Sequence, residues 1–521
     1  MAVPSPQDDP GSGVRAVFAR LLGLYALLLY PLLHADRPYN DDLKRALLGR
    51  ASWDSNGRPL TTLLMRALQC YDHTMVDIAP LPQIGAIVLL AWTGARLARR
   101  FTDASPWLAA LLVFPLGAQP FFLENLSYQF DALSMALAIW LAVWPLLMPT
   151  TRRGSGWGIA SLFGALCLYQ PAINVFLVLA LAELVLTQAA AAAAVSGLRT
   201  LLRRAVQVTV AMAVYELLVG MHISGWVKQQ AAPIHGWREI PRIADNFVAF
   251  HGFIGRSFNG HWWAVFGILA MLLALACVMV GVRHARPRDP HRPHGQRALL
   301  VALAFAMPLV AMIAALGPML LLRAPEIQPR VLIGIGALLA SGLLVLRVAL
   351  RPWAWAWGDR ACAAVAGAFA LGMGVIASAY GSAMADQQRF ERHVAAHLAD
   401  DLAAWPAATS IRRLVVTGST GFAPLAEHVA GEFPLMHTLV PTYLDATHRF
   451  ATSGWLMFYL PQWVDARHPQ LNRPLAGDAA LAARCATAPD RVAVGYRLCV
   501  QDGTALVQFQ PPALPTADER R

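Results

Sequence analysis

Long apolar runs separated by short polar segments are the dominant pattern of this chain. A helix of about 20 apolar residues crosses the hydrocarbon layer of a bilayer, so the pattern predicts about eleven transmembrane helices. The first seven lie approximately at residues 17–33, 78–95, 106–122 and 132–147, twice within 157–195, and at 205–221. The last four lie approximately at 262–282 and 298–316, and in runs that end near residues 346 and 381.

Cationic residues gather in short bands between these runs, and the segment 283–297 is the most basic. Cytoplasmic loops of membrane proteins carry an excess of Lys and Arg. With eleven spans, every arginine band falls on one side if the N-terminus is cytoplasmic. The pattern therefore predicts a cytoplasmic tail at 1–14, a membrane domain at 15–381 with a first outer loop at 35–77, and an extracytoplasmic C-terminal domain at 382–521.

The overall composition supports the bilayer as the solvent of this chain. Hydrophobic residues make up 57% and charged residues 14%, whereas about 25% charged residues is ordinary for a soluble domain. The formal net charge of +11 would suggest nucleic acid as a partner in a soluble protein. Here the cations belong to membrane-flanking bands, so we expect membrane lipids and no nucleic acid.

The tail has the pattern of a small mixed α/β domain. Residues 386–405 are helical in pattern, 412–417 is a strand candidate, and 496–501 with 504–508 predicts a hairpin around Asp502-Gly503. Two of the six cysteines, Cys485 and Cys499, lie in this tail. They are expected to pair if the tail faces an oxidising compartment.

The polar clusters predicted on the outer face are the candidate site. If these loops converge, they form one pocket at the outer membrane boundary. The candidate catalytic residues are Asp41 and Asp42. The candidate substrate-binding residues are Asn40, Lys44, Arg45, Trp53, Arg58, Glu124, Tyr128, Asp131, Tyr169, Gln170, Arg323 and Arg330.

A substrate that reaches such a pocket through the bilayer carries a lipid tail and an anionic head. Arginine binds a phosphate bidentately, and a carboxylate within hydrogen-bond reach of a hydroxyl acts as a general base. On a helix, Asp41 and Asp42 point about 100° apart, so one of them faces the hydroxyl while the other binds acceptor or a metal. The alternative is that both cap a juxtamembrane helix and pair with Lys44 and Arg45. The sequence indicates no definite cofactor. It leaves open whether a divalent metal assists, because no loop shows a ligand set beyond these two acids.

Several short motifs in this order resemble the type II serotype-converting O-antigen glucosyltransferases of bacteria. The resemblance covers roughly residues 15–390 and not the tail. The motifs are Asn40-Asp41-Asp42, Gly57-Arg58-Pro59-Leu60, Pro80-Leu81-Pro82-Gln83, Leu123-Glu124-Asn125-Leu126-Ser127-Tyr128-Gln129-Phe130-Asp131, Tyr169-Gln170-Pro171 and Gln328-Pro329-Arg330.

The resemblance implies a multi-span glycosyltransferase of the GT-C class in the bacterial inner membrane. It implies that a sugar, glucose for this family, moves from a polyprenyl-phosphate donor to a surface polysaccharide such as O-antigen on the periplasmic side. A flippase and a donor synthase are then expected partners. In that class an acidic residue of the first outer loop is the base, which corresponds to Asp41 or Asp42.

Two further acids support different functions. Glu183 and Glu216 lie within predicted spans, where an ionisable group is costly and marks a functional site by default. They favour a transporter or flippase of lipid-linked sugars, unless they pair with each other or with arginines at helix ends. A non-catalytic assembly protein that binds polysaccharide through its tail is the third hypothesis.

Overall fold

The computed structural model is mainly helical and divides into two compact units. We call residues 1–30, 51–70 and 78–377 the helical unit, and residues 31–50, 71–77 and 378–521 the α/β unit. The structure describes residues 10–70, 74–188, 194–223, 225–230, 232–285, 294–351, 355–406, 411–461 and 477–512. Parts of five predictions lie outside these residues: 1–9 of the N-terminal tail, 71–73 of the first outer loop, 189–193 of the long apolar run, 286–293 of the most basic loop, and 407–410, 462–476 and 513–521 of the C-terminal domain.

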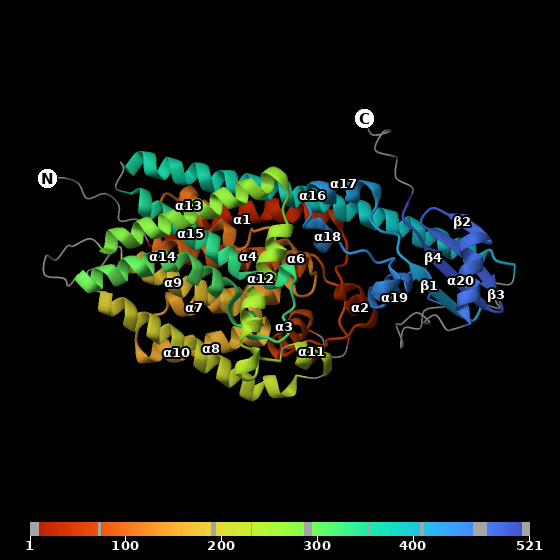
Figure 1. Ribbon diagram of the computed structural model, residues 1–521, viewed down its shortest axis with the longest axis horizontal. Helices are drawn as coiled ribbons and strands as arrows, with labels where there is room; N and C mark the ends of the chain where they lie inside the picture. Colours follow the sequence, from red (N-terminus) through yellow and green to blue (C-terminus); the bar gives the residue numbers. More distant parts are fainter. Residues whose placement is uncertain are drawn as a thin grey trace. The chain divides into compact units, whose positions relative to one another are not determined.

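Apolar helices that run roughly alongside one another build the helical unit, and α7 packs against both α4 and α8 (Figure 1). Its long helices are α1 (Pro10–Ala35), α4 (Leu81–Phe101), α7 (Ala132–Leu147), α8 (Arg152–Leu168), α9 (Ile173–Gln188), α10 (Ala194–Leu218), α13 (Gly260–Ala285), α14 (His294–Leu316), α15 (Gly334–Leu350) and α16 (Trp355–Ala403). Its shorter helices are α3 (Pro59–Gln69), α5 (Pro106–Val113), α6 (Phe122–Ser127), α11 (Gly225–Gln230) and α12 (Pro241–Arg256).

Six helices in the described part of the chain are long and apolar enough to cross a membrane. They are Ser12–Ala35, Leu81–Phe101, Arg199–His222, Gly260–Arg283, Val301–Leu321 and Trp357–Ala403. Shorter apolar helices are Pro106–Leu116, Ala132–Leu147, Gln170–Leu186 and Gly334–Leu350. A run of about 20 apolar residues spans the hydrocarbon layer, so the chain is a helical membrane protein.

The prediction of one continuous helix over residues 106–122 is wrong. Helix α5 ends at Val113, a 3-10 turn follows at Phe114–Leu116, and α6 begins only at Phe122. Pro115 and Pro120 lack the N–H that a helix interior requires. The backbone also passes close to α15 here, because a Cβ on Gly336 would lie 2.6 Å from the carbonyl oxygen of Pro115.

Helix α16 is longer than the apolar pattern predicts. The last apolar run ends near Gly381, but the helix continues to Ala403 without interruption. It therefore includes most of the polar segment 386–405, which the sequence predicts as a separate helix. Glu391 and Val394 therefore belong to the same continuous helix as the last apolar run.

The sheet of the α/β unit confirms the predicted strand and hairpin. Among the described residues it contains four strands in the order β1-β4-β3-β2, with β1 parallel to β4 and the other pairs antiparallel. The strands are β1 (Arg413–Gly418), β2 (Arg491–Ala493), β3 (Tyr496–Gln501) and β4 (Thr504–Phe509). Asp502 and Gly503 have φ values of 50° and 72°, which suit a two-residue hairpin turn.

Helices cover both faces of this sheet (Figure 1). Successive side chains of a strand point to opposite faces, so Leu414 and Val416 pack in the core that contains Val394 of α16, while Val415 packs against Leu481 of α20. The helices of this unit besides the end of α16 are α2 (Asp41–Leu48), α17 (Pro424–Glu432), α18 (Met436–Leu439), α19 (Arg449–Leu456) and α20 (Asp478–Thr487). A disulfide between Cys485 and Cys499 joins α20 to β3.

We predict that replacing both Cys485 and Cys499 by Ala lowers the free energy of unfolding by about 3 kcal/mol, because the cross-link closes a loop of about 15 residues. Chemical denaturation of the detergent-solubilised protein measures the change. The exposed Cys70, which is a free cysteine, provides the control. Equal stability of the double variant and Cys70→Ala would contradict the prediction.

Candidate functional site

The predicted site residues divide between the two units. Those of the α/β unit lie on or next to α2 and are Asn40, Asp41, Asp42, Lys44 and Arg45. Those of the helical unit are Trp53, Arg58, Glu124, Tyr128, Asp131, Tyr169, Gln170, Arg323 and Arg330. Each group is described by itself below.

Helix α2 is anchored by its apolar side and by its ends. Leu43 is buried in the core of the α/β unit, and Leu47 packs against that core. The helix ends at Leu48, and the next residue is Gly49, whose φ of 62° glycine adopts without strain and whose N–H donates to the carbonyl of Arg45. The rotation of α2 about its axis is therefore fixed by packing.

This rotation places the two adjacent carboxylates in different surroundings. The side chain of Asp41 is 53% exposed and lies 3.8 Å from Arg45. Asp42 is fully buried, and its carboxylate accepts a hydrogen bond of 3.3 Å from the backbone N–H of Tyr39. Asp42 thus organises the start of the helix, whereas the carboxylate of Asp41 is open to a hydroxyl or a cation.

The cations of α2 are largely buried beside these acids. Lys44 and Arg45 are each 6% exposed. Burial lowers the pKa of Lys44 to about 8, although attraction to Asp41 opposes this effect. Since Lys44 loses its charge more readily than an ordinary lysine, its attraction for an anion weakens in mildly alkaline solution.

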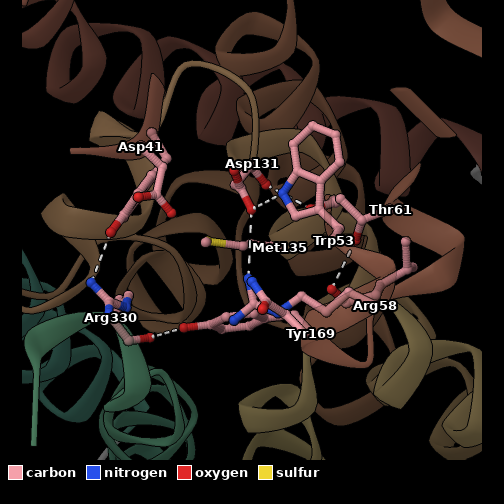
Figure 2. Close-up of polar contacts among 12 residues, drawn as sticks. Asp41, Trp53, Arg58, Thr61, Asp131, Met135, Tyr169 and Arg330 are labelled. Atoms are coloured by element: carbon pink, nitrogen blue, oxygen red, sulfur yellow. Dashed lines mark hydrogen bonds and ion pairs between the residues drawn. The ribbon is translucent and has the colours of Figure 1, made fainter. Parts of the chain in front are cut away.

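In the helical unit, Arg58 and Asp131 form the centre of a second group (Figure 2). Arg58 immediately precedes α3, and its guanidinium lies 3.5 Å from the carboxylate of Asp131. The indole N–H of Trp53 donates to the same carboxylate at 2.8 Å. Arg58 also lies over the ring of Tyr169, 4.7 Å from its centroid, and donates to Gln170 at 3.4 Å.

Arg330 holds the other half of this group. It lies in a 3-10 turn before α15, and its guanidinium donates to Glu124 at 2.8 Å and to the hydroxyl of Tyr128 at 2.7 Å. Glu326, four residues earlier, is a further ion-pair partner. The backbone N–H of Arg330 donates to Glu124 at 2.7 Å. Glu124 therefore fixes both the main chain and the side chain of Arg330.

Tyr169 joins the two halves into one arginine network, which we define as Arg58, Asp131, Tyr169, Arg330, Glu124 and Glu326. The hydroxyl of Tyr169 donates to the backbone carbonyl of Arg330 at 2.8 Å, while its ring lies against Arg58 (Figure 2). Residues from four segments, far apart in sequence, thus converge on one tyrosine.

The network contains three carboxylates and two guanidinium groups. Burial raises the pKa of Glu124, and the charge of Glu326 adds to this effect, whereas the contacts with Arg330 oppose it. For Arg330, burial disfavours the charged form, but Tyr128, Glu124 and Glu326 together hold its pKa well above the ordinary value. Arg330 therefore stays charged, and Glu124 and Glu326 already balance its charge. Arg58 has a longer ion pair, with Asp131.

Arg323 has a different partner from the arginine network. It is 44% exposed and donates to Glu239 at 3.0 Å, near the start of α12. Its backbone N–H donates to the carbonyl of Ala232. Arg323 therefore stabilises the connection around α12.

Several residues of these groups are absent from the predicted set. Glu326 lies between two predicted arginines, so its position four residues before Arg330 was a usable signal. Tyr215, whose hydroxyl accepts from Gln170 at 2.9 Å, and Glu391, which pairs with Arg37 at 2.7 Å, are distant in sequence from their partners. No local pattern indicates such contacts.

Glu183, one of the two acids that support the transporter hypothesis, has two cationic partners, of which Arg204 is buried. Glu183 accepts from Arg204 at 2.9 Å and lies 3.4 Å from Arg100. Arg204 also donates to the carbonyl of Pro145 at 2.8 Å. Glu216 is exposed. Glu183 therefore serves as the counter-ion of arginines on two neighbouring helices, α10 and α4. In the described ranges, no group of three His, Cys, Asp or Glu residues that could hold a metal occurs.

We predict that Arg330→Ala lowers the free energy of unfolding by about 3–5 kcal/mol, because it leaves the buried carboxylate of Glu124 without its cation. Arg323→Ala removes the same charge from an exposed pair and should cost at most about 1 kcal/mol. Chemical denaturation of both variants in detergent measures the difference. Equal losses would show that Arg330 is not a buried ion-pair partner.

Comparison with known proteins adds independent information. The family model "Glucosyl transferase GtrII" matches residues 30–341, a range that includes α2 and the arginine network. The chain is 24% identical over 446 residues to the "Uncharacterized 55.3 kDa protein in gtrB 5'region" of Salmonella phage P22, which covers 83% of this chain and 88% of that protein. No solved structure matches significantly. Because the family match spans more than half of the sequence, this chain belongs to the GtrII glucosyltransferase family and is a membrane-embedded glycosyltransferase.

Proposed function

We propose that this glycosyltransferase moves glucose from a polyprenyl-phosphate donor to a surface polysaccharide such as O-antigen, at the periplasmic face of the bacterial inner membrane. The family match supports the sugar and the class of acceptor. The helical membrane unit supports a lipid-linked donor, since such a donor reaches the enzyme through the bilayer.

The observation that carries the catalytic assignment is the exposure of Asp41 next to the buried Asp42. In the proposed reaction, an acceptor hydroxyl oxygen attacks the anomeric carbon of the donor sugar, and its proton passes to the Asp41 carboxylate. The bond between the anomeric carbon and the phosphate oxygen breaks, and the polyprenyl phosphate leaves with the electron pair. Asp41 meets the requirement for a general base, because its carboxylate is accessible and held on a rigid helix.

Arg58 is the proposed ligand of the donor phosphate. Its ion pair with Asp131 is 3.5 Å long, compared with 2.8 Å for Arg330 and Glu124. A guanidinium forms bidentate bonds with phosphate, and the longer ion pair makes Arg58 the more available of the two cations. The ring of Tyr169 stabilises the guanidinium of Arg58 through a cation–π contact.

The proposed orientation follows from the arginines at helix ends. Arg99 and Arg100 end α4, Arg152 begins α8, and Arg347 lies near the end of α15. If the shorter apolar helices and α8 also cross the membrane, giving eleven spans, these ends are cytoplasmic by the positive-inside rule. The α/β unit is then periplasmic, an oxidising compartment in which the Cys485–Cys499 disulfide persists.

We predict that Asp41→Asn lowers the kcat of sugar transfer by at least about 100-fold, because general bases contribute about that factor or more. Asp54→Asn, in the exposed 3-10 turn that follows α2, removes an equal charge and should retain activity. The measurement is the rate of sugar transfer from polyprenyl-phosphate glucose, in membranes that contain each variant at the normal level of expression. Full activity of Asp41→Asn would rule out Asp41 as the base, and full activity of Asp42→Asn as well would exclude the pair.

We predict that Arg58→Ala raises the KM for the polyprenyl-phosphate donor at least about tenfold and more than the KM for the acceptor, because a charge-assisted contact to phosphate is lost. Arg96→Ala, which removes an exposed arginine of α4, is the control for net charge. Initial rates with each substrate varied in turn separate the two constants. An equal rise in both would remove Arg58 from the phosphate-binding role.

A further inference from the structure

The residues just before α2 are held by the last part of α16 and by the chain that follows this helix. Arg37 donates to Glu391 of α16 at 2.7 Å and to the carbonyl of Pro441 at 2.7 Å. The side chains of Arg37 and Glu391 are both 0% exposed. A buried ion pair fixes the position of both partners, because separating them would leave an uncompensated charge.

Tyr443 makes the closest connection to the start of α2. Its hydroxyl donates to the carbonyl of Pro38 at 2.6 Å and accepts from the backbone N–H of Asn40 at 2.9 Å. Asn40 has a φ of 47° and immediately precedes Asp41. A non-glycine residue in this region of φ needs support from its surroundings, and the Tyr443 hydroxyl bridges the residues on both sides of Tyr39.

Glu391 ties Tyr443 to the same point. Its second carboxylate oxygen accepts from the backbone N–H of Tyr443 at 2.7 Å and from Gln387 at 2.9 Å. The ring of Tyr443 lies 4.4 Å from the guanidinium of Arg37. One carboxylate of α16 thus holds both Arg37 and the backbone of the tyrosine that supports Asn40.

We propose that Tyr443 and Glu391 are positioning residues for catalysis, which act by setting the direction in which α2 presents Asp41. This inference rests on the proposed role of Asp41 as the base. It gives the C-terminal segment, which lies beyond the residues matched by the family model, a function in sugar transfer. A displacement of about 1 Å in a catalytic group costs about 100-fold in rate, so loss of the hydroxyl should lower kcat by a smaller but measurable factor.

The test compares two tyrosines that each bury a hydroxyl in the α/β unit. Tyr443→Phe removes the two bonds to Pro38 and Asn40 and keeps the ring over Arg37. Tyr496→Phe is the matched control, because its fully buried side chain donates to Asp401 at 2.6 Å, away from residues 36–42. Kinetics of sugar transfer and amide exchange of the 36–48 peptide are measured on both full-length variants.

Tyr443→Phe is expected to lower kcat about tenfold, consistent with a partial loss of orientation, with both KM values within about twofold of the parent. Amide exchange should accelerate in the 36–48 peptide of Tyr443→Phe and not of Tyr496→Phe. In the Asp41→Asn background, Tyr443→Phe should cause no further loss, because a residue that acts through Asp41 has nothing left to position.

Two results would overturn the inference while leaving Asp41 as the base. One is an inactive Asp41→Asn variant together with equal kcat values for Tyr443→Phe and Tyr496→Phe. The other is a Tyr443→Phe effect that is undiminished in the Asp41→Asn background. Full activity of Asp41→Asn would instead reject the base and the positioning role together, so the two failures are distinguishable.

Discussion

Charges removed from water must be paired, and this constraint organises both units of the protein. The ion pair of Arg37 and Glu391 is fully buried, and Glu124 is 1% exposed beneath Arg330. The desolvation of one such ion costs several kcal/mol, which the partner and further hydrogen bonds must offset. In each case a backbone group adds a hydrogen bond to the pair, through the carbonyl of Pro441 in one unit and the N–H of Arg330 in the other.

The same constraint distinguishes three acids with buried structural partners from the exposed Asp41. Asp42, Glu124 and Glu391 are buried and accept hydrogen bonds from fixed donors. Asp41 is largely exposed beside Arg45. General base catalysis requires a carboxylate that the substrate can reach and that is held in a fixed direction. An exposed aspartate on an anchored helix meets both requirements. The packing of Leu43 and Leu47 sets which side of α2 faces the core, and therefore which of the two aspartates is buried.

Pairing also explains why an acid in an apolar helix need not mark a transport pathway. Glu183 was a functional candidate because an ionisable group among apolar residues is costly. Its contacts with Arg204 and Arg100 show that it compensates cations of neighbouring helices. The rule considers one helix at a time. It could not show that the partners of Glu183 lie on neighbouring helices. The family match to a glucosyltransferase agrees with a catalytic rather than a transport function.

The sequence alone determined the elements whose cause is local. Hydrophobic runs predicted the apolar helices, and Asp502-Gly503 between alternating residues predicted the hairpin, because turn chemistry and solvent preference act over a few residues. Ordered short motifs also indicated the family. Only the tertiary structure decided which of two adjacent aspartates is exposed, how Tyr169 joins Arg58 to Arg330, and that Glu391 supports the start of α2. These depend on contacts between residues distant in sequence, whose energies arise only after the chain has folded and excluded water.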